Sequence, residues 1–142
     1  MAASLLRHAL AGEDAPLNTT LVESAGVASV PGEPASSNSI AVLKKANLDI
    51  SKHKSQPVTQ ALIDHASIIL GMTDSHIHAL FAQKYLNLTK HVYLFREFMS
   101  TSGKSSQILD PFGQDFRSYQ ESFDSMIEAI PSLVTFIKKL FV

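Results

Sequence analysis

Asp110 is the residue in this sequence whose type and setting most suggest acid–base chemistry. Pro111 follows it and restricts it to extended conformations, which helps to aim its carboxyl group. An aimed carboxyl group can donate or accept a proton. Asp-Pro is also a common pair at the start of a turn, so a purely structural role is the alternative. Phe112 stands beside this pair and could line a substrate slot or pack beneath the loop.

The composition excludes several other kinds of site. The chain of 142 residues contains no cysteine, which excludes disulfides, thiol catalysis and thiolate metal ligands. His76 and His78 stand two positions apart, on different faces of a helix, so we expect no metal site and no cofactor. We find no glycine-rich phosphate motif and no Ser/His/Asp group.

The charge balance and hydropathy narrow the range of partners. Asp and Glu number 13 and Lys and Arg number 12, so the clustered basic charge typical of a nucleic-acid-binding protein is not expected. No apolar run reaches roughly 18 residues, which argues against a membrane span. The first ten residues are too short and too interrupted by Arg7 and His8 for a signal peptide. We therefore expect a cytoplasmic protein that binds neither nucleic acid nor membrane.

Helical and strand patterns alternate along the chain, which predicts an α/β fold with a mostly parallel sheet. Helices are predicted at Ala2–Leu10, Pro34–Lys45, Thr59–His65, His76–Tyr85 and Phe116–Leu140. Strands are predicted at Thr19–Glu23, Ser67–Met72 and His91–Phe95.

Two of these segments allow a sharper prediction. Ser67–Met72 is continuously apolar, which is typical of a strand buried on both faces. Pro131 interrupts the C-terminal helical pattern, and a proline inside a helix costs on the order of 3 kcal/mol. We therefore expect a kink or a break near Ala129.

Four segments, in the same order, resemble segments of the low-molecular-weight protein tyrosine phosphatases. Leu109–Gly113 resembles the general-acid loop that precedes the C-terminal helix in that family. The others are the Ser-Ala-Gly turn at Glu23–Val27, the Asp-Ile-Ser-x-His-x-Ser pattern at Asp49–Ser55, and the strand with a closing Met-Thr at Ile68–Thr73. Together they cover nearly the whole chain from Ala2 onward.

The resemblance implies a fold and a role for individual residues. It implies a three-layer α/β/α sandwich in a single domain, residues 1–142, acting on phosphotyrosine or phosphoarginine in proteins. Asp110 would be the catalytic acid that protonates the leaving group and then activates water, and Phe112 would line the substrate slot. Ser24 and His53 would hold the phosphate-binding loop by hydrogen bonds. A turn serine and an exposed loop histidine are the alternatives for the last two.

The family's Cys-x5-Arg phosphate loop has no counterpart in this sequence. The chain opens at the helix that should follow that loop, so the domain resembles one truncated at its N-terminus. The family's first strand, central in its sheet, is absent too. Thr19–Glu23 and Ser67–Met72 would then lose a shared neighbour. We expect a gap beside Ser67–Met72 or a strand from another chain, with possible self-association through the unpaired edges.

Three interpretations remain open from the sequence. The chain is a truncated phosphatase, inactive as given, whose complete form would hydrolyse phosphorylated proteins. Alternatively, it is a non-catalytic remnant that binds a partner or an anion. The third possibility is an unrelated α/β domain.

Overall fold

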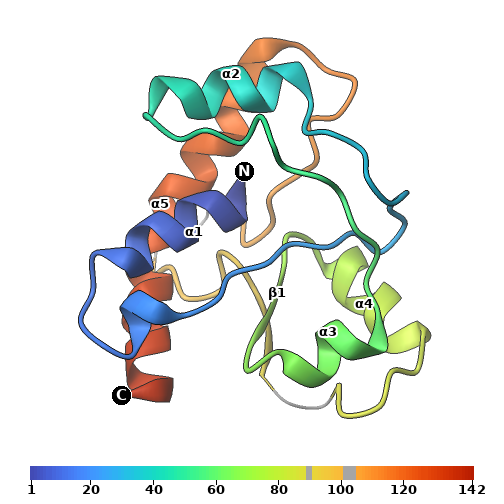
Figure 1. The fold of residues 1–142 in the computed structure, drawn as a ribbon, viewed down its shortest axis with the longest axis vertical. Helices are drawn as coiled ribbons and strands as arrows, with labels where there is room; N and C mark the ends of the chain where they lie inside the picture. Colours follow the sequence, from blue (N-terminus) through green and yellow to red (C-terminus); the bar gives the residue numbers. More distant parts are fainter. Residues whose placement is uncertain (89–90, 101–104) are drawn as a thin grey trace.

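The structure is a computed structural model that describes residues 1–88, 91–100 and 105–142. Its α/β fold confirms the predicted class, and all five predicted helices are present with slightly shifted bounds (Figure 1). The elements in chain order are α1 (Ala2–Ala11), the 3-10 helix η1 (Leu17–Thr19), α2 (Ser37–Lys45), α3 (Gln60–His65), β1 (Ile69–Gly71), α4 (Asp74–Ala82), β2 (Val92–Leu94) and α5 (Phe116–Phe141).

Four helices begin at a side chain that caps the first turn. In each case the capping oxygen accepts a hydrogen bond from a backbone N–H three residues later, which satisfies a group left free at a helix start. The capping residues are Ser36, Thr59, Thr73 and Asp115, for α2, α3, α4 and α5 respectively. Local sequence therefore determines where these helices begin.

The sheet consists of two parallel strands, β1 and β2, with Ile69 opposite Val92 and Gly71 opposite Leu94. The backbone N–H of Ile69 donates to the carbonyl of His91 (2.8 Å), and that of Phe95 donates to the carbonyl of Gly71 (2.9 Å). Helix α4 forms the connection that two parallel strands require. Both strands are shorter than the sequence predicted.

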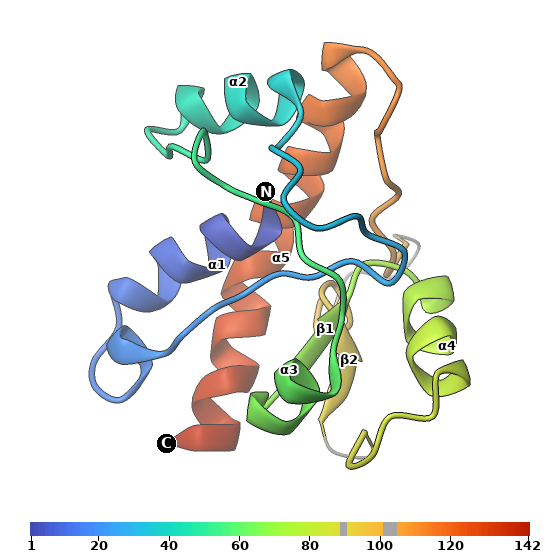
Figure 2. The same ribbon diagram turned by 45° about the vertical axis from the view of Figure 1, so that its right-hand side comes forward.

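Helices cover both faces of this sheet. Ile68, Leu70 and Met72 pack against the larger core cluster, most of whose buried residues come from α1 and α5. Ile69 faces the opposite way and packs with Ile63 of α3 and Leu80 of α4. Figures 1 and 2 show the sheet between these two helix layers. The predicted three-layer arrangement is therefore confirmed.

Thr19–Glu23 was predicted to be a strand, and this prediction is wrong. Its first residue belongs to η1, and residues 20–25 have no regular secondary structure. They run as an extended trace between α1 and the sheet (Figure 2). A strand requires a neighbour for its backbone groups, and β1 lies across a cavity from this segment. The expected gap on this edge of β1 is thus present.

A kink or a break was expected near Ala129, and the break is absent. Helix α5 runs without interruption for 26 residues, with Pro131 inside it. Ala129 and Leu133 flank the proline and are fully buried. Burying a large apolar side chain contributes about 1.5–3 kcal/mol, so the buried stripe of α5 offsets the proline.

No helix of the described residues is long and apolar enough to cross a membrane.

Candidate functional site

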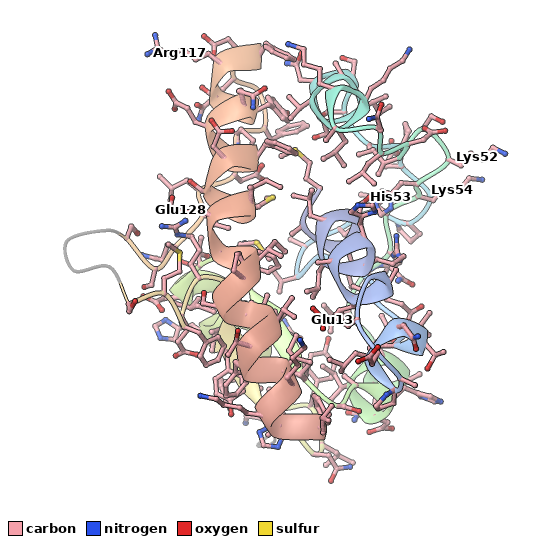
Figure 3. All side chains as sticks on the ribbon, turned by 90° about the vertical axis from the view of Figure 1, so that its left-hand side faces the viewer. Glu13, Lys52, His53, Lys54, Arg117 and Glu128 are labelled. Atoms are coloured by element: carbon pink, nitrogen blue, oxygen red, sulfur yellow. The ribbon has the colours of Figure 1, made fainter. Side chains whose placement is uncertain are left out.

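A polar cavity of about 370 Å³ lies at the amino end of α1. Met1, Ser4 and Arg7 line it from α1 and its start, and Ser24 and His53 line it from two loops. Figure 3 shows His53 beside this end of α1. The structure therefore brings Ser24 and His53 to one place, although 29 positions separate them in the sequence.

Groups of both charge signs line this cavity, and two of its positive groups have lowered pKa values. Partial burial, followed by the positive charges of the Met1 amino group and Arg7, lowers the pKa of His53. Burial also lowers the pKa of the Met1 amino group. Hydrogen bonds from Ser51 lower the pKa of Asp49, whose ionised carboxylate also lines the cavity. An added anion would stabilise the cationic forms of His53 and Met1.

Arg7 is a cavity residue that sequence reasoning did not identify. It lies three positions after Ser4, on the same helix face. Its Nη2 donates to the carbonyl of Val22 (2.6 Å), so it ties α1 to the segment after η1. The sequence offered only this spacing as a signal, because the contact with Val22 spans 15 residues.

Asp110 and Phe112 do not line this cavity. The Asp110 carboxylate accepts a hydrogen bond from the backbone N–H of Phe112 (3.0 Å), which forms a local turn. The Phe112 side chain is 79% exposed, so it does not pack beneath the loop. The structure thus leaves Asp110 and Phe112 accessible on an exposed loop, and neither lines the cavity at which Ser24 and His53 lie.

Hydrogen bonds hold the loop that carries Asp110 to the end of β1 and to α5. The backbone N–H of Ile108 donates to the carbonyl of Met72, at the end of β1 (2.8 Å). The hydroxyl of Ser122 on α5 donates to the carbonyl of Leu109 (3.3 Å). The acid loop therefore keeps a fixed position relative to the sheet and α5.

Arg96 adds a third fastening that the sequence did not reveal. Its side chain is only 5% exposed. Nε donates to the carbonyl of Ser105 (3.0 Å), and Nη1 donates to the carbonyl of Ser125 (2.7 Å). Nη1 also lies 3.5 Å from the carboxylate of Glu128. A buried guanidinium thus joins the start of the acid loop to α5.

A second cavity, of about 870 Å³, lies beside β1; we call it the strand slot. Residues 20–27 form one wall and residues 67–72 form the other. Side chains of α1 and α5, among them Leu6, Leu10 and Ile137, also line it. The strand slot occupies the gap that was expected beside Ser67–Met72, where the family's first strand has no counterpart in this sequence.

Metal binding has no support in the part of the chain that the structure describes. No three His, Asp or Glu side chains lie close enough together there to hold an ion.

The comparison with family models decides the relationship. The model described as low molecular weight phosphotyrosine protein phosphatase matches residues 1–141. The chain belongs to this family. A protein-arginine-phosphatase from Bacillus subtilis (strain 168) is 28% identical over 118 residues, which cover 83% of this chain and 76% of that protein. A probable low molecular weight protein-tyrosine-phosphatase, EpsP, from Ralstonia nicotianae is 26% identical over 140 residues, covering 99% and 88%.

Solved structures of this phosphatase family share the fold. Vibrio vulnificus Wzb in complex with benzylphosphonate has a TM-score of 0.79 and 26% identity, covering 94% of this chain and 86% of that one. The YwlE arginine phosphatase from Geobacillus stearothermophilus has a TM-score of 0.76 and 27% identity, covering 97% and 83%. The phosphatase-like fold that the sequence motifs implied is therefore confirmed.

Proposed function

We propose that this chain is the larger part of a single, N-terminally truncated phosphatase domain, which acts on phosphorylated proteins when a nucleophile-bearing segment precedes it. The observation that carries the proposal is the polar cavity at the amino end of α1, lined by Ser24 and His53. A helix start is favourable for a phosphate group because free N–H groups point toward it. Ser24 and His53 would support a phosphate loop there.

The proposed chemistry assigns the acid to Asp110. A cysteine thiolate attacks phosphorus, and Asp110 transfers its proton to the departing phenolate or amine. Water then attacks the phospho-cysteine, Asp110 takes its proton, and phosphate and thiolate are released. The exposed Phe112 would contact the substrate next to this carboxyl group. Because this chain has no cysteine, it should be inactive as given.

The family suggests the substrate class, and the phosphorylated side chain of the substrate would be tyrosine or arginine. The relatives include proteins named for arginine phosphatase and for tyrosine phosphatase activity. We therefore propose a protein-bound phosphotyrosine or phosphoarginine as the substrate. The lack of cysteine also fits a reducing compartment, and we place the protein in the cytoplasm.

The test is a comparison of two proteins. The 142-residue chain should not hydrolyse 4-nitrophenyl phosphate, a phosphotyrosine peptide or a phosphoarginine peptide. A longer protein, with an apolar strand and a Cys-x5-Arg loop before Met1, should hydrolyse at least one of them. Its Cys→Ser variant is the matched control. Turnover by the 142-residue chain, or none by a folded longer protein, would reject the proposal.

A second candidate function is a non-catalytic module that binds an anion or a partner. The grouping of the Met1 amino group, Arg7 and His53 at one cavity, in a chain without cysteine, favours it. Adding inorganic phosphate to the 142-residue chain should then raise the pKa of His53 in an NMR titration. His65, an exposed histidine outside this cavity, is the internal control. An unchanged pKa of His53 at millimolar phosphate would exclude anion binding at this cavity.

A further inference from the structure

We propose that Arg96 and Ser122 are positioning residues for the proposed general acid. They join the acid loop, residues 105–114, to α5 and so set the position of the Asp110 carboxylate. Neither residue touches the substrate in this role. The role depends on the assignment of Asp110 as the acid under the proposed function, and it names the side chains on which that assignment relies.

Asp110 itself receives no hydrogen bond from the rest of the fold, as far as the described residues show. The hydrogen bonds of residues 110–114 join these residues to one another. The N–H of Phe112 donates to the Asp110 carboxylate (3.0 Å), and that of Gln114 donates to the carbonyl of Pro111 (2.9 Å). The hydrogen bonds that place the Asp110 carboxylate relative to the fold therefore come from residues 105–109.

Ser122 bonds the residue immediately before the acid. Its hydroxyl donates from α5 to the carbonyl of Leu109 (3.3 Å), and Ser122 itself is buried. The Leu109 side chain is exposed, so packing of that side chain does not hold this part of the loop. Ser122 thus acts one residue away from the carboxylate that transfers the proton.

Arg96 holds the start of the same loop in a fixed direction. Its Nε donates to the carbonyl of Ser105 (3.0 Å) and its Nη1 to the carbonyl of Ser125 (2.7 Å). The guanidinium is planar, and its donors point in fixed directions. Ser105 therefore cannot move relative to Ser125 without losing one of these bonds. A lysine at this position would keep the charge but would lack the planar pair of donors.

Helix α5 connects the acid loop to the polar cavity. Helix α1, whose amino end borders that cavity, packs against α5, and Leu6 and Leu133 belong to the same core cluster. Figure 3 shows Glu128, the ion-pair partner of Arg96, on the side of α5 that faces away from α1. One helix thus determines where both the acid and the cavity lie. Loss of its bonds to the acid loop would shift the acid alone.

The first measurement uses the 142-residue chain and amide hydrogen exchange. The N–H of Ile108 donates to the carbonyl of Met72 (2.8 Å), so its exchange rate reports opening of the acid loop. Ser122→Ala and Arg96→Met should each speed this exchange at least about threefold relative to the amides of α1, the order expected from one lost hydrogen bond. The ratio to α1 separates local opening from global unfolding.

Ser132→Ala is the matched control for Ser122. Ser132 also lies on α5, but its hydroxyl donates within the helix, to the carbonyl of Ala129 (3.1 Å). This variant should leave the ratio unchanged.

The second measurement uses the longer protein with a Cys-x5-Arg loop and two aryl phosphates. An acid that is present but misplaced slows the substrate with the poor leaving group most. For phenyl phosphate, Ser122→Ala should lower kcat/KM about threefold, and Arg96→Met about tenfold or more. For 4-nitrophenyl phosphate, little change is expected. Arg96→Lys should recover only part of the loss.

Two controls accompany the kinetics. Ser132→Ala and Arg117→Met should keep the parent value of kcat/KM for both substrates. A purely structural role would reduce the amount of folded protein and so lower both substrates by the same factor.

Unchanged exchange at Ile108, or equal losses for the two aryl phosphates, would overturn the positioning role. The proposed function fails in a different way: the longer protein shows no turnover, or Asp110→Ala affects both substrates equally. The exchange at Ile108 still decides then whether Arg96 and Ser122 hold the acid loop. A leaving-group effect in Asp110→Ala alone would keep Asp110 as the acid and remove Arg96 and Ser122 as its positioning residues.

Discussion

The two edges of β1 differ in backbone pairing: one edge has a neighbouring strand and, among the described residues, the other has none. On one edge β1 pairs with β2. The nearby Met72 carbonyl accepts a hydrogen bond from the N–H of Ile108 in the acid loop. On the other edge lie a cavity of about 870 Å³ and a segment without regular structure. The faces of β1 are nevertheless packed alike, against α1 and α5 on one side and α3 and α4 on the other. Side-chain packing and backbone pairing are therefore separate requirements, and this chain meets only the first throughout.

The largest expected effect concerns Asp110, whose loop is bonded to the end of β1. It applies to the longer protein with a Cys-x5-Arg loop. Asp110→Ala should lower kcat by roughly 10²–10⁴-fold for a phenyl ester with a poor leaving group, which is typical of a lost general acid. A substrate with a good leaving group should be affected much less. Steady-state kinetics with both substrates measures the difference. An equal effect on both would remove Asp110 from the role of acid.

Shortening a side chain of the core should lower the free energy of unfolding more than shortening one that lines the strand slot. Leu133 is fully buried, so Leu133→Ala should lower the free energy of unfolding by about 2–5 kcal/mol. Leu21 lines the strand slot and is 80% exposed. Leu21→Ala should therefore change it by less than about 0.5 kcal/mol. Urea denaturation compares the two variants. A comparable loss for Leu21 would mean that the slot is closed in solution.

The buried anchor of the acid loop should have an intermediate effect. Arg96→Met leaves the carbonyls of Ser105 and Ser125 without their donor, and we expect a loss of about 2 kcal/mol in the free energy of unfolding. Arg117→Met is the matched control. Arg117 points outward at one end of α5 (Figure 3). Its ion pair with Glu121 is exposed, so about 0.5 kcal/mol or less is expected. Equal losses in urea denaturation would show that Arg96 does not anchor the loop.

The smallest expected effect is at the start of α5. Hydrogen bonds from Ser118, first from its backbone N–H and then from its hydroxyl, lower the pKa of Asp115. The ionised cap therefore stabilises the fold above the ordinary pKa of aspartate, and this contribution is lost as pH falls through the lowered value. Asp115→Ala should lower the Tm at pH 7 by about 3 °C.

The control for this position is Asp115→Asn, which keeps a capping oxygen but does not titrate. Its Tm should stay near that of the parent at pH 7, and the difference between Asn and Asp should shift in favour of Asn as the pH falls below 4. A calorimetric pH series measures both. An Asp115→Ala difference that does not change with pH would contradict the charged cap.

The sequence predicted the elements better than their pairing. Helix caps and apolar spacing are local properties, so the helices and Ser67–Met72 were found. Thr19–Glu23 has the β-branched residues of a strand, but a strand exists only with a neighbour, and local pattern does not encode that neighbour. Pro131 does not break α5 because the burial of Ala129 and Leu133 offsets its cost. This burial is a tertiary effect, which the local sequence does not show.

The candidate site was predictable only in part, for the same reason. Family motifs named Ser24 and His53, which the structure places at one cavity. Their catalytic support role remains a proposal, as do the roles of Asp110 and Phe112. Arg7 and Arg96 were missed because their contacts span many residues, and a lone arginine in a sequence resembles a solvated one.

The position of Met1 makes the two ends of this protein unequal as points of attachment. The amino end lines both cavities, whereas Val142 is 78% exposed at the tip of α5 (Figure 1). A tag or solid support joined at Val142 leaves both openings accessible. One joined at the half-buried Met1 lies at both cavities and obstructs them.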